Sequence, residues 1–164
     1  MKVEIGKNAP LFAIKSDSGK EIKLAELKGK NVVLYFYPKD DTPGCTIEAQ
    51  DFTSKIKEFE KLDCIVLGVS KDSIDSHCKF IKKYGISFNL LSDENGELCK
   101  EYDVLKEKSM FGKKYQGIDR STFLIDKMGK ISAIWNSVKV SGHVDEVLDS
   151  LKQQSLDKKK SSKK

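Results

Sequence analysis

Two short apolar runs and one helical stripe dominate the pattern of hydrophobic and polar positions along the chain. The segment 30–38 contains Val-Val-Leu-Tyr-Phe-Tyr, and residues 64–70 form a second such run. Apolar runs of this length without polar alternation are typical of parallel strands that are buried on both faces. Between the two runs, Phe52, Ile56 and Phe59 recur at spacings of four and three, which predicts a helix from about residue 45.

The remaining elements alternate between helices and strands. In chain order, we expect a helix over 73–84 that ends at Gly85, a short strand at 88–91, a short helix over 93–102, a polar loop over 106–119, a hairpin of 121–126 with 130–135, and a closing helix over 144–151. The first 28 residues predict a small hairpin around Ser18 and Gly19, followed by a short helical turn.

This order of elements resembles that of a thioredoxin-like sheet. Parallel strands in the first half and an antiparallel hairpin in the second predict an α/β fold, with a central mixed sheet flanked by helices and an N-terminal hairpin extension. The sequence contains no internal repeat and no linker-like segment. We therefore predict one domain over residues 1–153 and a disordered, lysine-rich tail over 154–164.

Composition narrows the class of protein. Hydrophobic residues make up 38% and charged residues 34% of the 164 residues, which is typical of a soluble globular domain. No apolar run approaches the roughly 18–20 residues that cross a bilayer, and the N-terminus lacks the apolar region of a secretion signal. We therefore expect a cytoplasmic protein without a membrane partner, whose four cysteines are free or catalytic rather than paired in a structural framework.

The basic residues give two indications, one from where the net charge lies and one from the single arginine. The formal net charge of +5 resides in five lysines after residue 157, so a solvated terminus explains it better than a nucleic-acid arm, and we expect no nucleic-acid partner. Arg120 is the only arginine among 30 lysine and arginine residues. One arginine in a chain so rich in lysine suggests a place that needs a rigid, planar cation with several donors.

The segment from Pro38 to Glu48 joins the end of the first predicted strand to the start of the helix, and it contains Thr42 and Cys45. In open α/β sheets, ligands bind beyond the carboxyl ends of the strands. A cysteine in the first turn of a helix faces unpaired backbone N–H groups and the positive end of the helix dipole, and both favour its thiolate. Cys45 is therefore the candidate nucleophile.

A thiolate is what the reduction of a peroxide needs. The sulfur attacks one peroxide oxygen and displaces the other, which gains negative charge and requires fixed donors. The guanidinium of Arg120 can contact the thiolate and the peroxide oxygens together, and the Thr42 hydroxyl can reach the same place. Pro38, which has no N–H, can form a wall of the pocket.

These residues resemble a motif of the peroxiredoxin family. Pro38-x-x-x-Thr42-x-x-Cys45, followed far downstream by Arg120-Ser-Thr-Phe-Leu-Ile, is similar to the family pattern, and residues 37–48 are similar to its Q-type branch, the bacterioferritin-comigratory-protein-like peroxiredoxins. The likeness extends from about residue 6 to residue 151. It implies that Cys45 is the peroxidatic cysteine, that Pro38, Thr42 and Arg120 form its pocket, and that Glu48 supports them by orienting Arg120.

The same resemblance implies an activity and its requirements. The family reduces hydrogen peroxide and organic hydroperoxides without a metal or an organic cofactor, and a thioredoxin-like protein usually recycles the enzyme. Q-type relatives are often monomers, with a face-to-face dimer as the alternative.

Each of these residues also has an ordinary explanation. A cysteine after Pro-Gly is most often a small buried residue, and Thr42 could only cap the helix. Arg120 could be a surface charge, and Glu48 could complement the helix N-terminus. The combination of all four in this spacing favours a site.

The chain departs from the Q-type pattern at Gln50, where many relatives carry a second, resolving cysteine. Cys78 lies on the predicted helix 73–84, about one turn before Ile81, the position of this cysteine in other relatives, and is the preferred resolving residue. Its disulfide with the nucleophile would need Cα atoms within roughly 7 Å, so the catalytic turn would have to unwind. Cys99 is the second choice, and Cys64 is expected in the core. If none resolves, the chain is a one-cysteine peroxidase that an external thiol recycles directly.

Two other classes of protein are weaker explanations. A thioredoxin-like disulfide oxidoreductase needs a Cys-x-x-Cys arrangement, which the chain lacks. A non-catalytic binding or chaperone module on the same scaffold would have a Cys45 of ordinary reactivity. His77 and His143 have no second ligand at metal spacing, so we interpret both as structural or surface residues.

Overall fold

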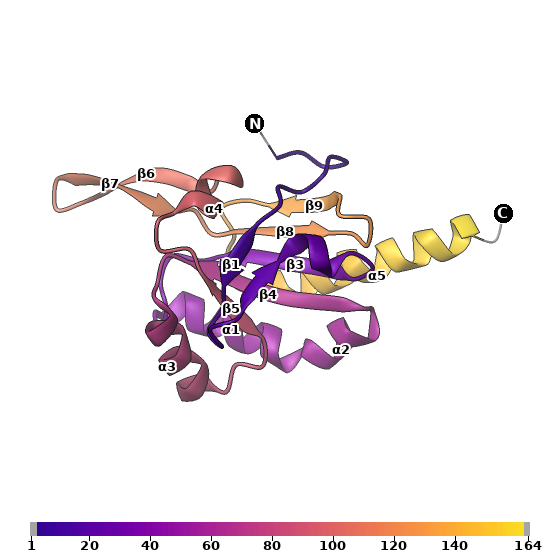
Figure 1. The fold of residues 1–164 in the computed structure, drawn as a ribbon, viewed down its shortest axis with the longest axis horizontal. Coiled ribbons are helices and arrows are strands. Elements are labelled where there is room, and N and C mark those ends of the chain that lie inside the picture. The colour runs from indigo at the N-terminus through magenta and orange to yellow at the C-terminus, as the bar shows by residue number, and fades with distance from the viewer. Residues whose placement is uncertain (1–2, 163–164) are drawn as a thin grey trace.

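Five strands form the central sheet of the computed structural model, which describes residues 3–162 (Figure 1). In spatial order they are β5 (Asn89–Ser92), β4 (Cys64–Ser70), β3 (Asn31–Phe36), β8 (Ser121–Ile125) and β9 (Ile131–Trp135). β3, β4 and β5 pair in parallel, whereas β8 is antiparallel to both β3 and β9. The predicted mixed sheet is thus confirmed, with β3 at its centre.

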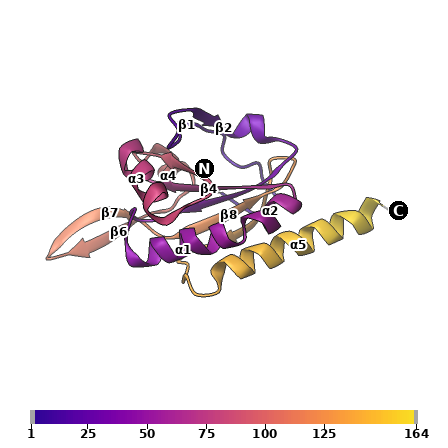
Figure 2. The same cartoon turned by 90° about the horizontal axis from the view of Figure 1, so that it is seen from below.

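The helices are α1 (Pro43–Ser54), α2 (Ile56–Lys61), α3 (Ile74–Tyr84), α4 (Glu97–Glu101) and α5 (His143–Ser162). α1 and α5 run beside each other across one face of the sheet, as Figure 2 shows. The predicted stripe between the first two strands forms two helices rather than one, because Lys55 leaves helical geometry between Ser54 and Ile56. Ser73 caps the start of α3, where its side chain accepts a hydrogen bond from the Ser76 N–H, and Gly85 ends the helix as predicted.

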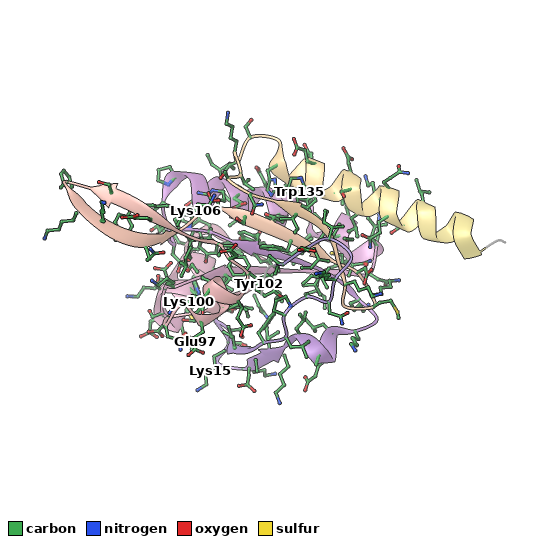
Figure 3. All side chains as sticks on the ribbon, turned by 90° about the horizontal axis from the view of Figure 1, so that it is seen from above. Lys15, Glu97, Lys100, Tyr102, Lys106 and Trp135 are labelled. Atoms are coloured by element: carbon green, nitrogen blue, oxygen red, sulfur yellow. The ribbon has the colours of Figure 1, made fainter. Side chains whose placement is uncertain are left out.

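Side chains of β3 alternate between two apolar layers, one on each face of the sheet. Val33 and Tyr35 of β3, and Tyr37 directly after it, enter the layer that is covered by α1, α2, α3 and α5. Val32, Leu34 and Phe36 enter the layer on the other face, together with residues of α4. Tyr102, at the end of α4, lies over the middle of that second face in Figure 3. The continuous apolar run of β3 follows from this burial on both sides.

The first residues form the predicted small hairpin of β1 (Ala13–Lys15) and β2 (Glu21–Lys23), followed by a short 3-10 helix, η1 (Leu24–Leu27). The prediction of a polar loop over 106–119 is wrong. This segment is an antiparallel ribbon of β6 (Leu105–Met110) and β7 (Lys113–Ile118), which projects from the body in Figure 1. Most of its described side chains are exposed, so its strands leave no apolar alternation in the sequence.

α5 is longer than the predicted closing helix over 144–151. It continues past residue 153, where the sequence predicted the start of a disordered tail, and runs to Ser162. The Gln154 side chain donates a hydrogen bond to Oδ1 of Asn31 at 3.0 Å, so the contact of α5 with the sheet extends at least this far. The boundary between domain and tail stays a prediction.

Candidate active site

Cys45 lies in the first turn of α1, just beyond the carboxyl end of β3. Pro43 is the first helical residue, where its fixed φ suits the helix and its missing N–H costs nothing. Thr42, which precedes the proline, is extended with φ −101° and ψ 155°, as a residue before proline prefers. Its carbonyl accepts the Thr46 N–H at 2.9 Å and so begins the helix. The local sequence therefore places Cys45 at a helix N-terminus, as predicted.

Arg120 reaches Cys45 from the start of β8. Its Nη2 donates to the Cys45 Sγ at 3.3 Å, and the cysteine is only 2% exposed. The Arg120 backbone is held at the same time, because its carbonyl accepts the Val138 N–H at 2.9 Å. Arg120 thus presents a positive charge and an N–H donor to a buried sulfur.

Glu48 lies one helical turn after Cys45 and holds the other branch of the guanidinium. Arg120 Nη1 donates to Glu48 Oε1 at 2.6 Å, and the Glu48 side chain is completely buried. Burial raises the pKa of Glu48 to about 7, against the opposing effect of the Arg120 charge. The planar fork of Arg120 thus joins two residues of one helix face and is fixed in orientation by Glu48.

Gly44 leaves the space that the guanidinium occupies. A Cβ at this position would lie 3.1 Å from Arg120 Nη2. The sequence alone does not single out Gly44, because a glycine beside a proline is explained equally well by a turn.

Thr42 and Pro38 lie in the loop before Cys45, and the hydrogen bond to the Cys45 sulfur comes from Arg120 instead. Thr42 is the N-cap residue of α1, as the capping alternative expected, but its hydroxyl donates to the Lys39 carbonyl at 2.9 Å and makes no capping hydrogen bond to the helix. Since its proton is engaged, the hydroxyl oxygen is left as an acceptor. Pro38 is exposed in the loop between β3 and α1.

The other three cysteines differ in burial. Cys64 begins β4 in the core, as expected, and burial raises the pKa of its thiol to about 12. Cys99 on α4 is completely buried, which also raises its thiol pKa, and it belongs to the apolar layer on the opposite face of the sheet from Cys45. Cys78 on α3 is partly exposed, and its thiol donates to the Asp17 carbonyl at 3.0 Å.

Both histidines are buried, so the surface alternative is wrong for each. His143 opens α5, and its Nε2 lies 2.8 Å from Oγ1 of Thr122. Burial, with a smaller contribution from the Arg120 charge, lowers the pKa of His143 to about 4, so its ring is neutral. The ring of Trp135 packs against this ring in an edge-to-face arrangement, with 5.8 Å between the ring centroids, and Trp135 lies beside α5 in Figure 3. Within residues 3–162, no helix is long and apolar enough to cross a membrane.

Comparisons with known proteins agree with this geometry. Residues 5–134 match the model of the AhpC/TSA family. The chain is 52% identical to the peroxiredoxin bcp of Coxiella burnetii over 92% of this chain and 100% of the relative, and 50% identical to the peroxiredoxin Bcp of Bacillus subtilis over 94% and 99%. It is also similar to the structure of the Xanthomonas campestris bacterioferritin comigratory protein, with a TM-score of 0.84 and 44% identity over 88% of this chain and 92% of that one.

The chain therefore belongs to the AhpC/TSA family, and within it to the peroxiredoxins of the Q type, also called Bcp. It has their thioredoxin fold, and it is a thiol peroxidase that works through cysteine chemistry. The expectations of family, fold and activity are confirmed.

Proposed function

We propose that Cys45 is the thiolate that attacks the peroxide and that Arg120 stabilises both the thiolate and the leaving oxygen. The contact of Arg120 Nη2 with the Cys45 Sγ at 3.3 Å carries this proposal. The sulfur forms a bond to one peroxide oxygen, the O–O bond breaks, and the second oxygen leaves with the electron pair and takes up a proton. The cysteine becomes a sulfenic acid, and the peroxide becomes water or an alcohol.

Thr42 and Pro38 complete the proposed pocket. The Thr42 hydroxyl gives its proton to the Lys39 carbonyl, so its oxygen is oriented to accept a hydrogen bond from the O–H of the peroxide. Pro38 follows the last buried residue at the end of β3 and has no N–H to compete for the substrate. Glu48 keeps the guanidinium in the plane that serves both the sulfur and the substrate.

The substrates we propose are hydrogen peroxide and organic hydroperoxides. The bacterioferritin comigratory protein of Xanthomonas campestris has an alkyl peroxide reduction activity. We infer the same class of substrate here from the 44% identity and from the shared fold.

A test of the nucleophile is the Cys45→Ser variant. We expect it to consume no hydrogen peroxide above the uncatalysed rate, whereas Cys64→Ser, which changes a cysteine at the opposite end of the sheet, keeps the activity. Peroxide consumption by Cys45→Ser at the wild-type rate would rule out the proposed role.

Cys78 is the proposed resolving residue, because of the three other cysteines it alone is not buried. The Cys78 thiolate would attack the sulfenic sulfur, form the disulfide and release water, and a thioredoxin-like dithiol would then reduce the disulfide. Cys99 is a weaker candidate for the resolving residue than Cys78, since the sheet separates Cys99 from Cys45. The one-cysteine cycle, in which an external thiol reduces the sulfenic acid, remains the alternative.

Disulfide mapping by mass spectrometry after one equivalent of hydrogen peroxide tests this choice. We expect a Cys45–Cys78 link that the Cys78→Ser variant lacks. A Cys45–Cys99 link, or a sulfenic acid that persists in the wild type, would overturn the assignment of Cys78. We further propose that the protein acts as a monomer in the cytoplasm, which sedimentation of the reduced and oxidised protein tests for the oligomeric state.

A further inference from the structure

Asp40 lies five residues before Cys45 and is buried, yet its carboxylate does not contact the sulfur site described above. Three side chains donate to it. Tyr37 Oη lies 2.5 Å from Oδ1, while Ser76 Oγ and His77 Nδ1 lie 2.8 Å and 2.7 Å from Oδ2. With these three contacts, both oxygens of the buried carboxylate have hydrogen-bond partners.

Both ring nitrogens of His77 face groups that accept hydrogen bonds. Nδ1 faces the Asp40 carboxylate, and Nε2 lies 2.9 Å from the carbonyl oxygen of Leu91 on β5. A neutral imidazole has a proton on only one nitrogen, so both contacts are satisfied only when His77 and Asp40 together hold one more proton. Because Asp40 already accepts two hydroxyl groups, this proton resides on the ring. His77 is therefore an imidazolium, buried and paired with Asp40.

This ion pair joins α3 to the loop that precedes α1. The Asp40 N–H is held from another side, since it donates to Oδ2 of Asp72 at 2.8 Å. The next residue, Asp41, has a φ of 56°, a left-handed conformation that costs some free energy in any residue with a side chain, although less in aspartate than in most. Its own bonds to Lys83 and Tyr84 are exposed and therefore weak. The pair of Asp40 and His77 is buried, whereas the pair of Asp41 and Lys83 is exposed, so we take the buried pair as the main side-chain restraint on this loop.

We propose that His77, as an imidazolium, is a positioning residue for peroxide reduction: it holds Asp40, and through Asp40 the loop from which Thr42 and the first turn of α1 present Cys45 to Arg120. The proposal rests on the role proposed above for Cys45. It adds a residue that touches neither the sulfur nor the guanidinium, on a helix distant in sequence from the catalytic turn.

The proposal predicts a specific pH dependence. His77 is faced by Asp40 from the catalytic loop, by Tyr37 from the end of β3, by Asp72 from the loop after β4, and by the Leu91 carbonyl from β5. Burial alone would lower the pKa of His77, but the hydrogen bond and charge of Asp40 raise it overall, with smaller contributions from the hydrogen bond to the Leu91 carbonyl and from the charge of Asp72. The restraint is therefore complete below the unfolded value of about 6.5 and is lost as the pH rises through the raised value of the folded protein.

Two matched variants separate the two contacts of the ring. In His77→Asn the amide nitrogen takes the place of Nδ1 and keeps a neutral donor toward Asp40. In His77→Gln it takes the place of Nε2 and keeps only the bond to Leu91. The measurement is the second-order rate constant for oxidation of Cys45 by hydrogen peroxide in a single turnover, between about pH 5.5 and 9.

Near pH 6 we expect His77→Gln to react roughly ten- to a hundredfold more slowly than the wild type, and His77→Asn to lose less. The ratio of the wild-type rate to the His77→Asn rate should fall as the pH rises, because only the wild type loses the charge of His77, and pH effects common to both proteins cancel in the ratio. A residue that only fills the core gives a ratio independent of pH, and a flat ratio would overturn the proposal. Wild-type reactivity of His77→Gln near pH 6 would do the same.

Asp40→Asn tests the other partner and keeps the proposal falsifiable if the His77 variants fail to fold. It should lose the same pH-dependent component, and the double variant Asp40→Asn/His77→Asn should lose little more, whereas additive losses would count against the pair. Asp63→Asn is the control, because it removes an exposed carboxylate that binds Lys30 and Lys127 and should react as the wild type. Peroxide reduction by Cys45→Ser would contradict the proposed nucleophile. If Cys45→Ser is inactive and the ratio of the wild-type rate to the His77→Asn rate does not change with pH, only the role of His77 is contradicted.

Discussion

Arg120 contacts two acceptors with two nitrogens of one rigid group. Nη1 donates to Glu48 and Nη2 to Cys45, both of which belong to the same face of α1. A lysine offers the same charge at a single point and cannot hold both contacts with a fixed plane between them. The use of arginine once in a lysine-rich chain has a geometric reason at this position.

Arg120→Lys should therefore lose activity although the charge is unchanged. We expect the rate constant for oxidation of Cys45 to fall roughly a hundredfold, as it does when one donor to a developing anion is removed. Stopped-flow fluorescence of the Trp135 indole, with circular dichroism to show that the fold is kept, measures this loss. Near-normal turnover would show that charge alone is sufficient.

Gly44 is a second residue with a geometric constraint. A Cβ at this position would lie 3.1 Å from Arg120 Nη2, and the guanidinium is anchored on both sides and has little room to move. We expect Gly44→Ala to slow peroxide reduction roughly tenfold while stability stays equal or rises, because alanine is the better helix former. Urea unfolding and single-turnover kinetics of the same sample separate the two effects. A parallel loss of both would indicate a general distortion of α1.

The raised pKa of Glu48 predicts that the free energy of unfolding depends on pH. Burial raises its pKa to about 7 in the fold, above the value of about 4.5 that it has when exposed. A raised carboxyl pKa means that the folded state binds the proton more tightly, so stability is lost as the pH rises from about 4.5 to 7. Glu48→Gln lacks this loss and should gain on the order of 3 kcal/mol relative to the wild type over that range. Urea unfolding at several pH values measures it, and parallel curves for the two proteins would contradict the shift.

At the scale of elements, burial decides which ones the sequence reveals. The apolar runs of β3 and β4 are buried almost throughout, and the sequence predicted both strands closely. β6 and β7 form a ribbon whose strands expose both faces, so they lack the alternation that marks a half-buried strand. At the turn between these strands Phe111 and Gly112 both have a positive φ, but in the sequence only the glycine points to a turn. The break at Lys55 was equally invisible, since the apolar spacing continues across it.

The end of α3 gives a prediction for one element. Gly85 has a φ of 64° and closes the helix, and a Cβ there would meet nothing within 4 Å. The cost of Gly85→Ala is therefore backbone strain alone, about 1 kcal/mol, and Gly85→Asn should cost less because asparagine tolerates this conformation. Thermal unfolding measures both, and the rate of peroxide reduction should not change. An equal cost for the two variants would point to a lost contact instead of strain.

At the scale of the whole molecule, the sequence revealed the site as far as local spacing reaches. Cys45 and Glu48 share a helix face by their spacing. Arg120, far downstream, was singled out as the only arginine of the chain, and the family resemblance then assigned it to the pocket of Cys45. The buried pair of Asp40 and His77 was missed, because two distant polar residues acquire meaning only when the fold brings them within 2.7 Å. Spacing along one helix is visible in a sequence, whereas a contact between a loop and a distant helix is not.

The sheet also divides the cysteines between its two faces. Cys45 and Cys64 lie in the layer under α1, at opposite ends of it, whereas Cys99 lies in the layer on the other face. Cys78 alone is partly exposed to solvent. Access to a thiol reagent should therefore rank the cysteines without any reference to peroxide chemistry.

In the reduced Cys45→Ser variant, a neutral alkylating reagent should modify Cys78 first. Cys64 and Cys99 are buried, and burial also raises their thiol pKa values, so both need an opening of the structure before they react. Peptide mass spectrometry over time should show them protected by orders of magnitude relative to Cys78, and equally reactive after unfolding in urea. Modification of Cys99 as fast as Cys78 would show that the apolar layer around α4 opens readily. Cys99 would then be as good a candidate for the resolving residue as Cys78.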